Sequence, residues 1–188
     1  MIEIRWHGRG GQGAKTAALL LADAALSAGK YVQAFPEYGP ERMGAPVQSF
    51  NRIDENPILM HCPVKSPQVV VVLDPTLMAS VNVTAGLGAD GMLIINTGLD
   101  AVEIKKSVKF EGRIFTVDAS KISEETIGKN IPNTPMLAAL VKITGILDFK
   151  SMMEDTEHKL AKKFAHRPEV IEGNIQSMKR AAEEVKSA

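Results

Sequence analysis

The feature that most constrains the fold of this sequence is an uninterrupted apolar run, Val-Val-Val-Val-Leu, at residues 69–73. A strand without a polar residue on either face is typical of a parallel sheet that is covered on both faces. Residues 92–96, Met-Leu-Ile-Ile-Asn, repeat the pattern. The two runs therefore predict strands in the middle of an α/β fold.

Apolar periodicity and turn residues predict alternating strands and helices along most of the chain. The expected strands are residues 2–6, 31–35, 47–53, 68–73, 92–96 and 113–117, and the expected helices are residues 14–28, 75–85, 101–107, 120–128 and 135–144. This alternation predicts a three-layer α/β/α fold with a mostly parallel, Rossmann-like sheet and right-handed crossovers. We expect one domain over residues 1–188, with residues 148–188 as C-terminal helices packed on it.

A glycine-rich turn separates the first expected strand from the first expected helix. Gly8, Gly10 and Gly13 match the spacing G-x-G-x-x-G, and Gly11 adds a fourth glycine. Glycines permit positive φ and close approach of a ligand, and the N–H groups that open the helix attract negative charge. Arg9 and Lys15 add positive charge at the same place. The turn predicts an anion or nucleotide site, and a plain tight turn is the structural alternative.

Two familiar nucleotide-binding motifs do not fit this turn. In a Walker A loop the last glycine directly precedes the lysine, whereas here Ala14 separates Gly13 from Lys15. A dinucleotide-binding loop requires an acidic residue at the end of the second strand. The expected second strand ends at Phe35 without one, and Glu37 follows in a loop. The turn therefore assigns the chain neither to the nucleotidases nor to the dehydrogenases.

Composition excludes several classes of protein. A formal net charge of zero argues against a nucleic-acid partner, and no apolar run is long enough to cross a membrane. Cys62 is the only cysteine, so the chain cannot form an internal disulfide or supply a four-cysteine cluster site by itself. A strand expected from residue 2 leaves no room for a signal peptide, and we expect a cytoplasmic protein.

The expected helix at residues 14–28 carries only Lys15 and Asp23 as charged residues. A helix that is apolar on all sides is normally covered on all sides. Either a partner subunit packs over its outer face, or its small alanines tolerate exposure. His7, at the end of the first strand, is expected to be structural rather than a phosphate contact.

A second informative segment, residues 35–47, reads Phe-Pro-Glu-Tyr-Gly-Pro-Glu-Arg-Met-Gly-Ala-Pro-Val. Three prolines and two glycines predict a rigid loop, which would lie beside the glycine turn. The structural alternative is a connector with an internal Glu–Arg pair. Together with the glycine turn, Asp74-Pro75 and Asn-Thr-Pro-Met-Leu-Ala at residues 133–138, this segment resembles the gamma subunit of 2-oxoacid:ferredoxin oxidoreductases, most closely the pyruvate-specific (pyruvate synthase) type.

The resemblance covers roughly residues 1–185 and implies a role in oxidative decarboxylation of a 2-oxoacid. The products are an acyl-CoA, carbon dioxide and reduced ferredoxin. It implies alpha, beta and delta subunits as partners, with thiamine diphosphate, magnesium and [4Fe-4S] clusters on those chains. The gamma chain is expected to lie near the coenzyme A site. Met43 departs from the family pattern, in which a second arginine is expected after Arg42.

We therefore expect no catalytic residue and no metal ligand in this chain, but a contribution to the coenzyme A site. The expected binding residues are Gly8, Arg9, Gly10, Gly11, Gln12, Gly13, Lys15, Tyr38, Arg42 and Asn133. Two alternatives remain open. One is a free-standing Rossmann-type oxidoreductase that binds NAD or flavin, and the other is a scaffold subunit whose turn serves only the fold.

Overall fold

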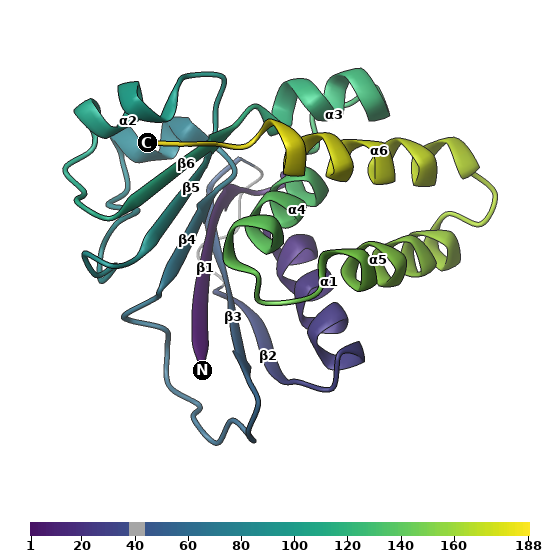
Figure 1. Ribbon diagram of the computed structural model, residues 1–188, viewed down its shortest axis with the longest axis horizontal. Coiled ribbons are helices and arrows are strands. Elements are labelled where there is room, and N and C mark those ends of the chain that lie inside the picture. Colours follow the sequence, from purple (N-terminus) through teal and green to yellow (C-terminus); the bar gives the residue numbers. More distant parts are fainter. Residues whose placement is uncertain (38–43) are drawn as a thin grey trace.

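The computed structural model describes residues 1–37 and 44–188. The strands are β1 (Ile2–Arg9), β2 (Tyr31–Glu37), β3 (Pro46–Asp54), β4 (Val69–Val72), β5 (Met92–Asn96), β6 (Arg113–Val117) and β7 (Lys186–Ser187). The helices are α1 (Ala14–Ser27), the 3₁₀ helix η1 (Pro75–Ala79), α2 (Ala101–Ser107), α3 (Ala119–Ile127), α4 (Asn133–Thr144), α5 (Phe149–Lys163) and α6 (Pro168–Glu184). Figure 1 shows these elements arranged around one sheet.

The sheet has seven strands in the order β2-β3-β1-β4-β5-β6-β7. Strands β1, β4, β5 and β6 are parallel neighbours, whereas β3 is antiparallel to both β1 and β2, and β7 is antiparallel to β6. The expectation of an α/β fold is confirmed, but a mostly parallel sheet describes only its centre. The direction of β3 was not predictable from apolar periodicity, because the pattern of a strand is the same in either direction.

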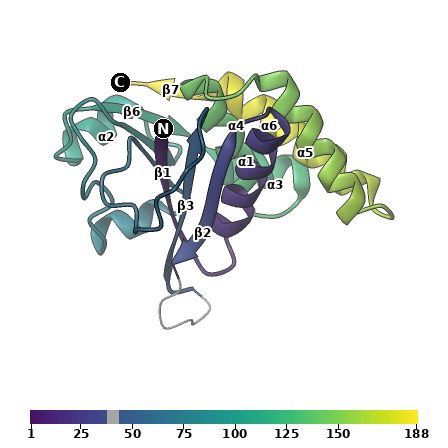
Figure 2. The same ribbon diagram turned by 90° about the horizontal axis from the view of Figure 1, so that it is seen from below.

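Helices cover the two faces of the sheet unequally (Figures 1 and 2). One face packs on α1 and α3–α6, in a core that includes Trp6, Val71 and Ile94. The other face packs on α2 and the region of η1, in a smaller core that includes Val70 and Leu93. Because successive strand residues point to opposite faces, Val70 and Val71 enter different cores. The uninterrupted apolar runs thus lie where a strand is covered on both sides.

Several expected boundaries were wrong. Strand β1 continues to Arg9, so that the first glycine of the turn belongs to the strand. The helix expected at residues 75–85 is only the five-residue η1. Strand β2 extends to Glu37, two residues beyond its expected end. The two-residue β7 was not expected, because its pairing with β6 joins segments far apart in the chain.

Much of the apolar surface of α1 is covered by other parts of the same chain. Leu21 is fully buried, and the core it enters also includes residues of α4 and α5. Leu20 is partly buried, whereas Leu19 and Leu26 are 43% and 63% exposed. Neither a partner subunit nor exposed alanines is needed to explain most of the apolar surface of α1, since helices from the C-terminal part of the chain cover it. A partner could meet only the stripe that contains Leu19 and Leu26.

Candidate anion-binding site

The glycine turn links the end of β1 to the start of α1 through two residues with positive φ. Gly11 has a φ of 99°, and Gly13, which precedes α1, has a φ of 83°. Gly13 is the N-cap of α1, and a glycine has no side chain that could cap the helix. The N–H groups of an uncapped first turn attract anions, because the helix dipole places partial positive charge there. The local geometry therefore agrees with the interpretation of the turn as an anion site.

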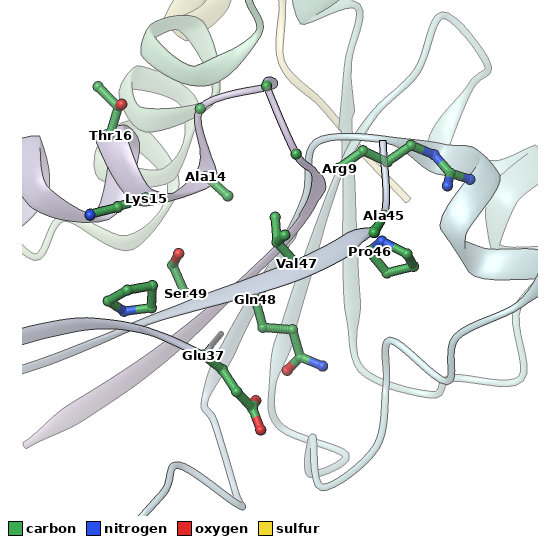
Figure 3. A pocket seen from close by; sticks show the side chains of 14 residues that line it. Arg9, Ala14, Lys15, Thr16, Glu37, Ala45, Pro46, Val47, Gln48 and Ser49 are labelled. Atoms are coloured by element: carbon green, nitrogen blue, oxygen red, sulfur yellow. The ribbon is translucent and has the colours of Figure 1, made fainter. Parts of the chain in front are cut away.

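A cavity of about 350 Å³ lies between this turn and the neighbouring strands (Figure 3). The turn and the first residues of α1, including Lys15 and Thr16, form one wall. The end of β2 and the start of β3 form the other wall, with Pro36, Val47 and Ser49. The cavity thus combines a helix N-terminus and an ammonium group with apolar surface, as in sites that hold a charged and an apolar part of one ligand.

Arg9 lines the cavity but extends away from Lys15 and Thr16 (Figure 3). Its Nε forms an ion pair with Asp74 Oδ2 at 3.0 Å. Its Nη1 donates to the carbonyl of Gly44 at 3.1 Å, and its Nη2 donates to Thr76 Oγ1 at 2.9 Å. The guanidinium group therefore already has an anionic partner, so a direct contact with a ligand phosphate would require it to leave that partner.

Asp74 follows β4 and is the N-cap of η1. Burial acts to raise the pKa of Asp74, but hydrogen bonds from Thr76 and Gln12 and the charge of Arg9 outweigh it and lower the pKa. The carboxylate is consequently ionised over the whole neutral range. A charged Asp74 keeps Arg9 and Gln12 in place, because hydrogen bonds to an ionised group are stronger than neutral ones.

Comparison with known proteins identifies the family of this chain. The model of the family "Pyruvate ferredoxin/flavodoxin oxidoreductase" matches residues 3–184. The chain belongs to this family. The pyruvate synthase subunit PorC of Thermotoga maritima is 50% identical over 184 residues, which are 98% of this chain and 94% of the relative. The predicted resemblance and the expected oxidoreductase class are confirmed.

One further relative and a crystal structure support the assignment to the pyruvate ferredoxin/flavodoxin oxidoreductase family. The pyruvate/ketoisovalerate oxidoreductases common subunit gamma of Pyrococcus abyssi is 52% identical over 153 residues, covering 81% of this chain and 83% of the relative. The crystal structure of the pyruvate oxidoreductase subunit PORC of Thermotoga maritima superposes with a TM-score of 0.87 and 49% identity. The superposition covers 100% of this chain and 98% of that structure.

The structure separates the predicted binding residues of this family member into three groups. Arg9, Gly10, Gly11, Gly13 and Lys15 line the cavity. Gly8, Gln12 and Asn133 lie around the turn without lining the cavity. Tyr38 and Arg42 fall outside the described residues.

The residues behind the turn support its shape. A Cβ on Gly8 would stand 3.3 Å from Leu73 Cδ1 and 3.4 Å from Ala14 Cβ, so glycine lets α1 lie close to the sheet. Gln12 Oε1 accepts a hydrogen bond from the N–H of Arg9 at 2.7 Å. Asn133, at the start of α4, fills the space beside Gly13. These residues therefore shape the turn, and none of the three lines the cavity.

Sequence reasoning placed Glu37 in a loop, but it is the last residue of β2 and lines the cavity. This removes the sequence ground against a dinucleotide site, which was the lack of an acidic residue at the end of the second strand. The strand order still argues against a dinucleotide-binding unit. In such a unit the first two strands pair directly, whereas here antiparallel β3 lies between β1 and β2. Asp74 appeared in the sequence only as part of a motif, and its contact with the turn was missed.

His7 does not line the cavity and lies on the opposite face of β1 from Trp6. It is 2% exposed, and its Nε2 accepts a hydrogen bond from Arg5 Nε at 2.9 Å. Burial and the charge of Arg5 lower the pKa of His7 to about 4. The imidazole is therefore neutral, as a structural histidine requires. Arg5 also donates to the carbonyls of Val83 and Ala85 at 2.9 and 2.7 Å.

The described part of the chain offers neither a metal-binding cluster nor a membrane-spanning helix. Across residues 1–37 and 44–188, no group of three or more acidic, histidine or cysteine side chains is placed to hold a metal ion. Within the same ranges, no helix is long and apolar enough to span a membrane.

Proposed function

We propose that this chain is the gamma subunit of a heteromeric 2-oxoacid:ferredoxin oxidoreductase that acts on pyruvate. The complex would convert the 2-oxoacid and coenzyme A to an acyl-CoA and carbon dioxide, with the electrons passing to ferredoxin. The observation that carries the proposal is the 50% identity to a pyruvate synthase subunit over 98% of this chain.

The remaining chemistry is assigned to partner subunits, named alpha, beta and delta. Thiamine diphosphate, magnesium and the [4Fe-4S] clusters would be held there, since one cysteine cannot supply the four ligands of a cluster. The subunit of Pyrococcus abyssi is named as common to pyruvate and ketoisovalerate oxidoreductases. If one gamma chain serves enzymes for two different 2-oxoacids, the pocket that selects the 2-oxoacid would lie on other chains. We place the complex in the cytoplasm.

Within this division of labour, the cavity at the glycine turn is proposed to bind coenzyme A. The phosphates would lie at the uncapped start of α1, where Lys15 and the first N–H groups offer positive charge. Pro36 and Val47 on the opposite wall would pack against an apolar part of the molecule. Arg9 is held by Asp74, so its effect on the ligand would be indirect.

Kinetics of the assembled complex test this site. Lys15→Ala should raise the KM for coenzyme A by about ten-fold, because losing a charge-assisted hydrogen bond costs about 1.5–3 kcal/mol. The KM for pyruvate should not change. A bulky residue at Gly11 should also raise the KM for coenzyme A, because a side chain there would enter the approach to the backbone.

The matched control is Lys121→Ala. Lys121 is also exposed in the first turn of a helix, but Asp118 Oδ1 accepts a hydrogen bond from its N–H at 3.1 Å and caps that helix. This control should leave the KM for coenzyme A unchanged. If Lys15→Ala and the Gly11 variant also leave it unchanged in an intact complex, the turn serves only the fold. Saturable NAD binding to the isolated chain would instead support the alternative of a free-standing dehydrogenase.

A further inference from the structure

Asp74 holds the glycine turn at two points although it does not line the cavity. Its Oδ2 accepts hydrogen bonds from Arg9 Nε at 3.0 Å and from Gln12 Nε2 at 2.9 Å. Gln12 Oε1 in turn accepts from the backbone N–H of Arg9 at 2.7 Å. One carboxylate oxygen therefore connects the end of β1 with the middle of the turn.

The anchor is itself well fixed. Asp74 Oδ1 accepts from the N–H of Thr76 at 2.9 Å and from Thr76 Oγ1 at 2.6 Å. Asp74 follows β4, whose four residues are fully buried between the two cores. Movement of this carboxylate would thus break two hydrogen bonds to Thr76 in η1. A group held in this way can keep a flexible, glycine-rich segment in one conformation.

The position of the Arg9–Asp74 pair in the sheet explains why the cavity lies to one side. Strands β1 and β4 are parallel neighbours, but α1 leaves β1 on one face and η1 leaves β4 on the other. Ligands of such sheets normally bind in the crevice outside the carboxyl ends of two strands that diverge in this way. Here the ion pair spans that position, and the cavity opens toward β3 instead.

We propose that Asp74 is a positioning residue for the coenzyme A site. It holds the turn, through Arg9 and Gln12, in the conformation in which the start of α1 faces the cavity. It also neutralises Arg9 and keeps that guanidinium group on the η1 side of the turn. This inference rests on the proposed function of the cavity, and the experiment below separates the two.

The test is an exchange of donor and acceptor in the assembled complex. Asp74→Asn places an amide beside the donors of Arg9 and Gln12, and Gln12→Glu places a carboxylate beside Asp74. Each single variant should raise the KM for coenzyme A by about ten-fold and leave the KM for pyruvate and kcat unchanged. The double variant restores the donor–acceptor pair between positions 12 and 74, but Arg9 Nε then faces an amide N–H instead of a carboxylate oxygen. It should therefore lower the KM for coenzyme A only part of the way back to the original value.

Asp148→Asn is the matched control. Asp148 caps α5 with the same pattern, since its Oδ1 accepts from the N–H of Ser151 at 2.8 Å and from Ser151 Oγ at 2.7 Å. This variant should lower thermal stability without changing the KM for coenzyme A.

Each remaining outcome rejects the positioning role, and the last one also rejects the coenzyme A site. If Asp74→Asn acts like Asp148→Asn while Lys15→Ala raises the KM for coenzyme A, Asp74 is only a helix cap, and the proposed site survives. A double variant whose KM for coenzyme A is no lower than that of either single variant would also reject the positioning role. If neither Asp74→Asn nor Lys15→Ala changes the KM, the proposed coenzyme A site fails together with the inference drawn from it.

Discussion

The side chain of Asn133 occupies the space directly beside Gly13, so that a Cβ on Gly13 would stand 2.6 Å from Asn133 Nδ2. Gly13 also has a φ of 83°. Positive φ costs about 1–2 kcal/mol and overpacking about 1–3 kcal/mol, so Gly13→Ala should lower the free energy of unfolding by about 2–5 kcal/mol. Urea denaturation of the purified chain measures this change.

Gly29→Ala is the control for backbone strain alone. Gly29 has a φ of 78°, but nothing lies within 4 Å of the position of its Cβ. This variant should lose only about 1–2 kcal/mol. Asn133→Ala should recover part of the loss when it is combined with Gly13→Ala. Equal losses for the two glycine variants would show that Asn133 imposes no additional constraint.

His7 should make the stability of the protein depend on pH. Its pKa is lowered to about 4, chiefly by burial and also by Arg5, from an ordinary value of 6.5. Between these pH values the unfolded chain binds a proton that the folded chain does not. The stability present above pH 6.5 should therefore fall as the pH falls toward 4, by about 1.4 kcal/mol per pH unit at most.

His7→Gln removes this titration and keeps an acceptor for Arg5. Urea denaturation from pH 4 to pH 8 should give a shallower dependence for the variant than for the original chain. Carboxyl groups titrate in both proteins, so only the difference between the two curves reports on His7. Parallel curves would mean that the imidazole is not held neutral by the fold.

Breaking the buried ion pair between Arg52 and Glu3 should strongly destabilise the chain. Arg52 Nε lies 2.7 Å from Glu3 Oε1, and the arginine side chain is only 1% exposed. Glu3→Ala should destabilise the chain by about 3–5 kcal/mol, because it leaves a buried charge without its partner. Glu169→Ala, which breaks an exposed pair with Arg167, should have little effect. Similar thermal midpoints for the two variants would contradict the prediction.

Leu19 and Leu21 should respond in opposite ways to replacement by lysine. Leu21 is fully buried, so Leu21→Lys should unfold the chain. Leu19 is 43% exposed, so Leu19→Lys should retain the circular dichroism spectrum. If the exposed stripe of α1 contacts another subunit, Leu19→Lys should also weaken co-purification of the complex. Normal assembly by this variant would remove Leu19 from the interface.

The sequence alone predicted the elements well, because apolar periodicity reports the burial of each residue within its own segment. The run at residues 69–73 indicated a strand covered on both faces, and Val70 and Val71 do enter opposite cores. The glycine spacing likewise indicated a turn between a strand and a helix. Each of these features depends on neighbours within about one turn or strand, so local chemistry is sufficient to determine it.

The tertiary structure decided which segments meet. No local pattern distinguishes a parallel from an antiparallel β3, since strand direction depends on how the chain returns to the sheet. The role of Arg9 changed for the same reason. Its place in the glycine turn suggests a ligand contact, but Asp74, 65 residues away in the sequence, forms an ion pair with it. The sequence by itself determined the chemistry available at the turn. Only the tertiary structure decided which groups the side chains of the turn contact, because ion pairs and hydrogen bonds form between atoms that lie close together in space.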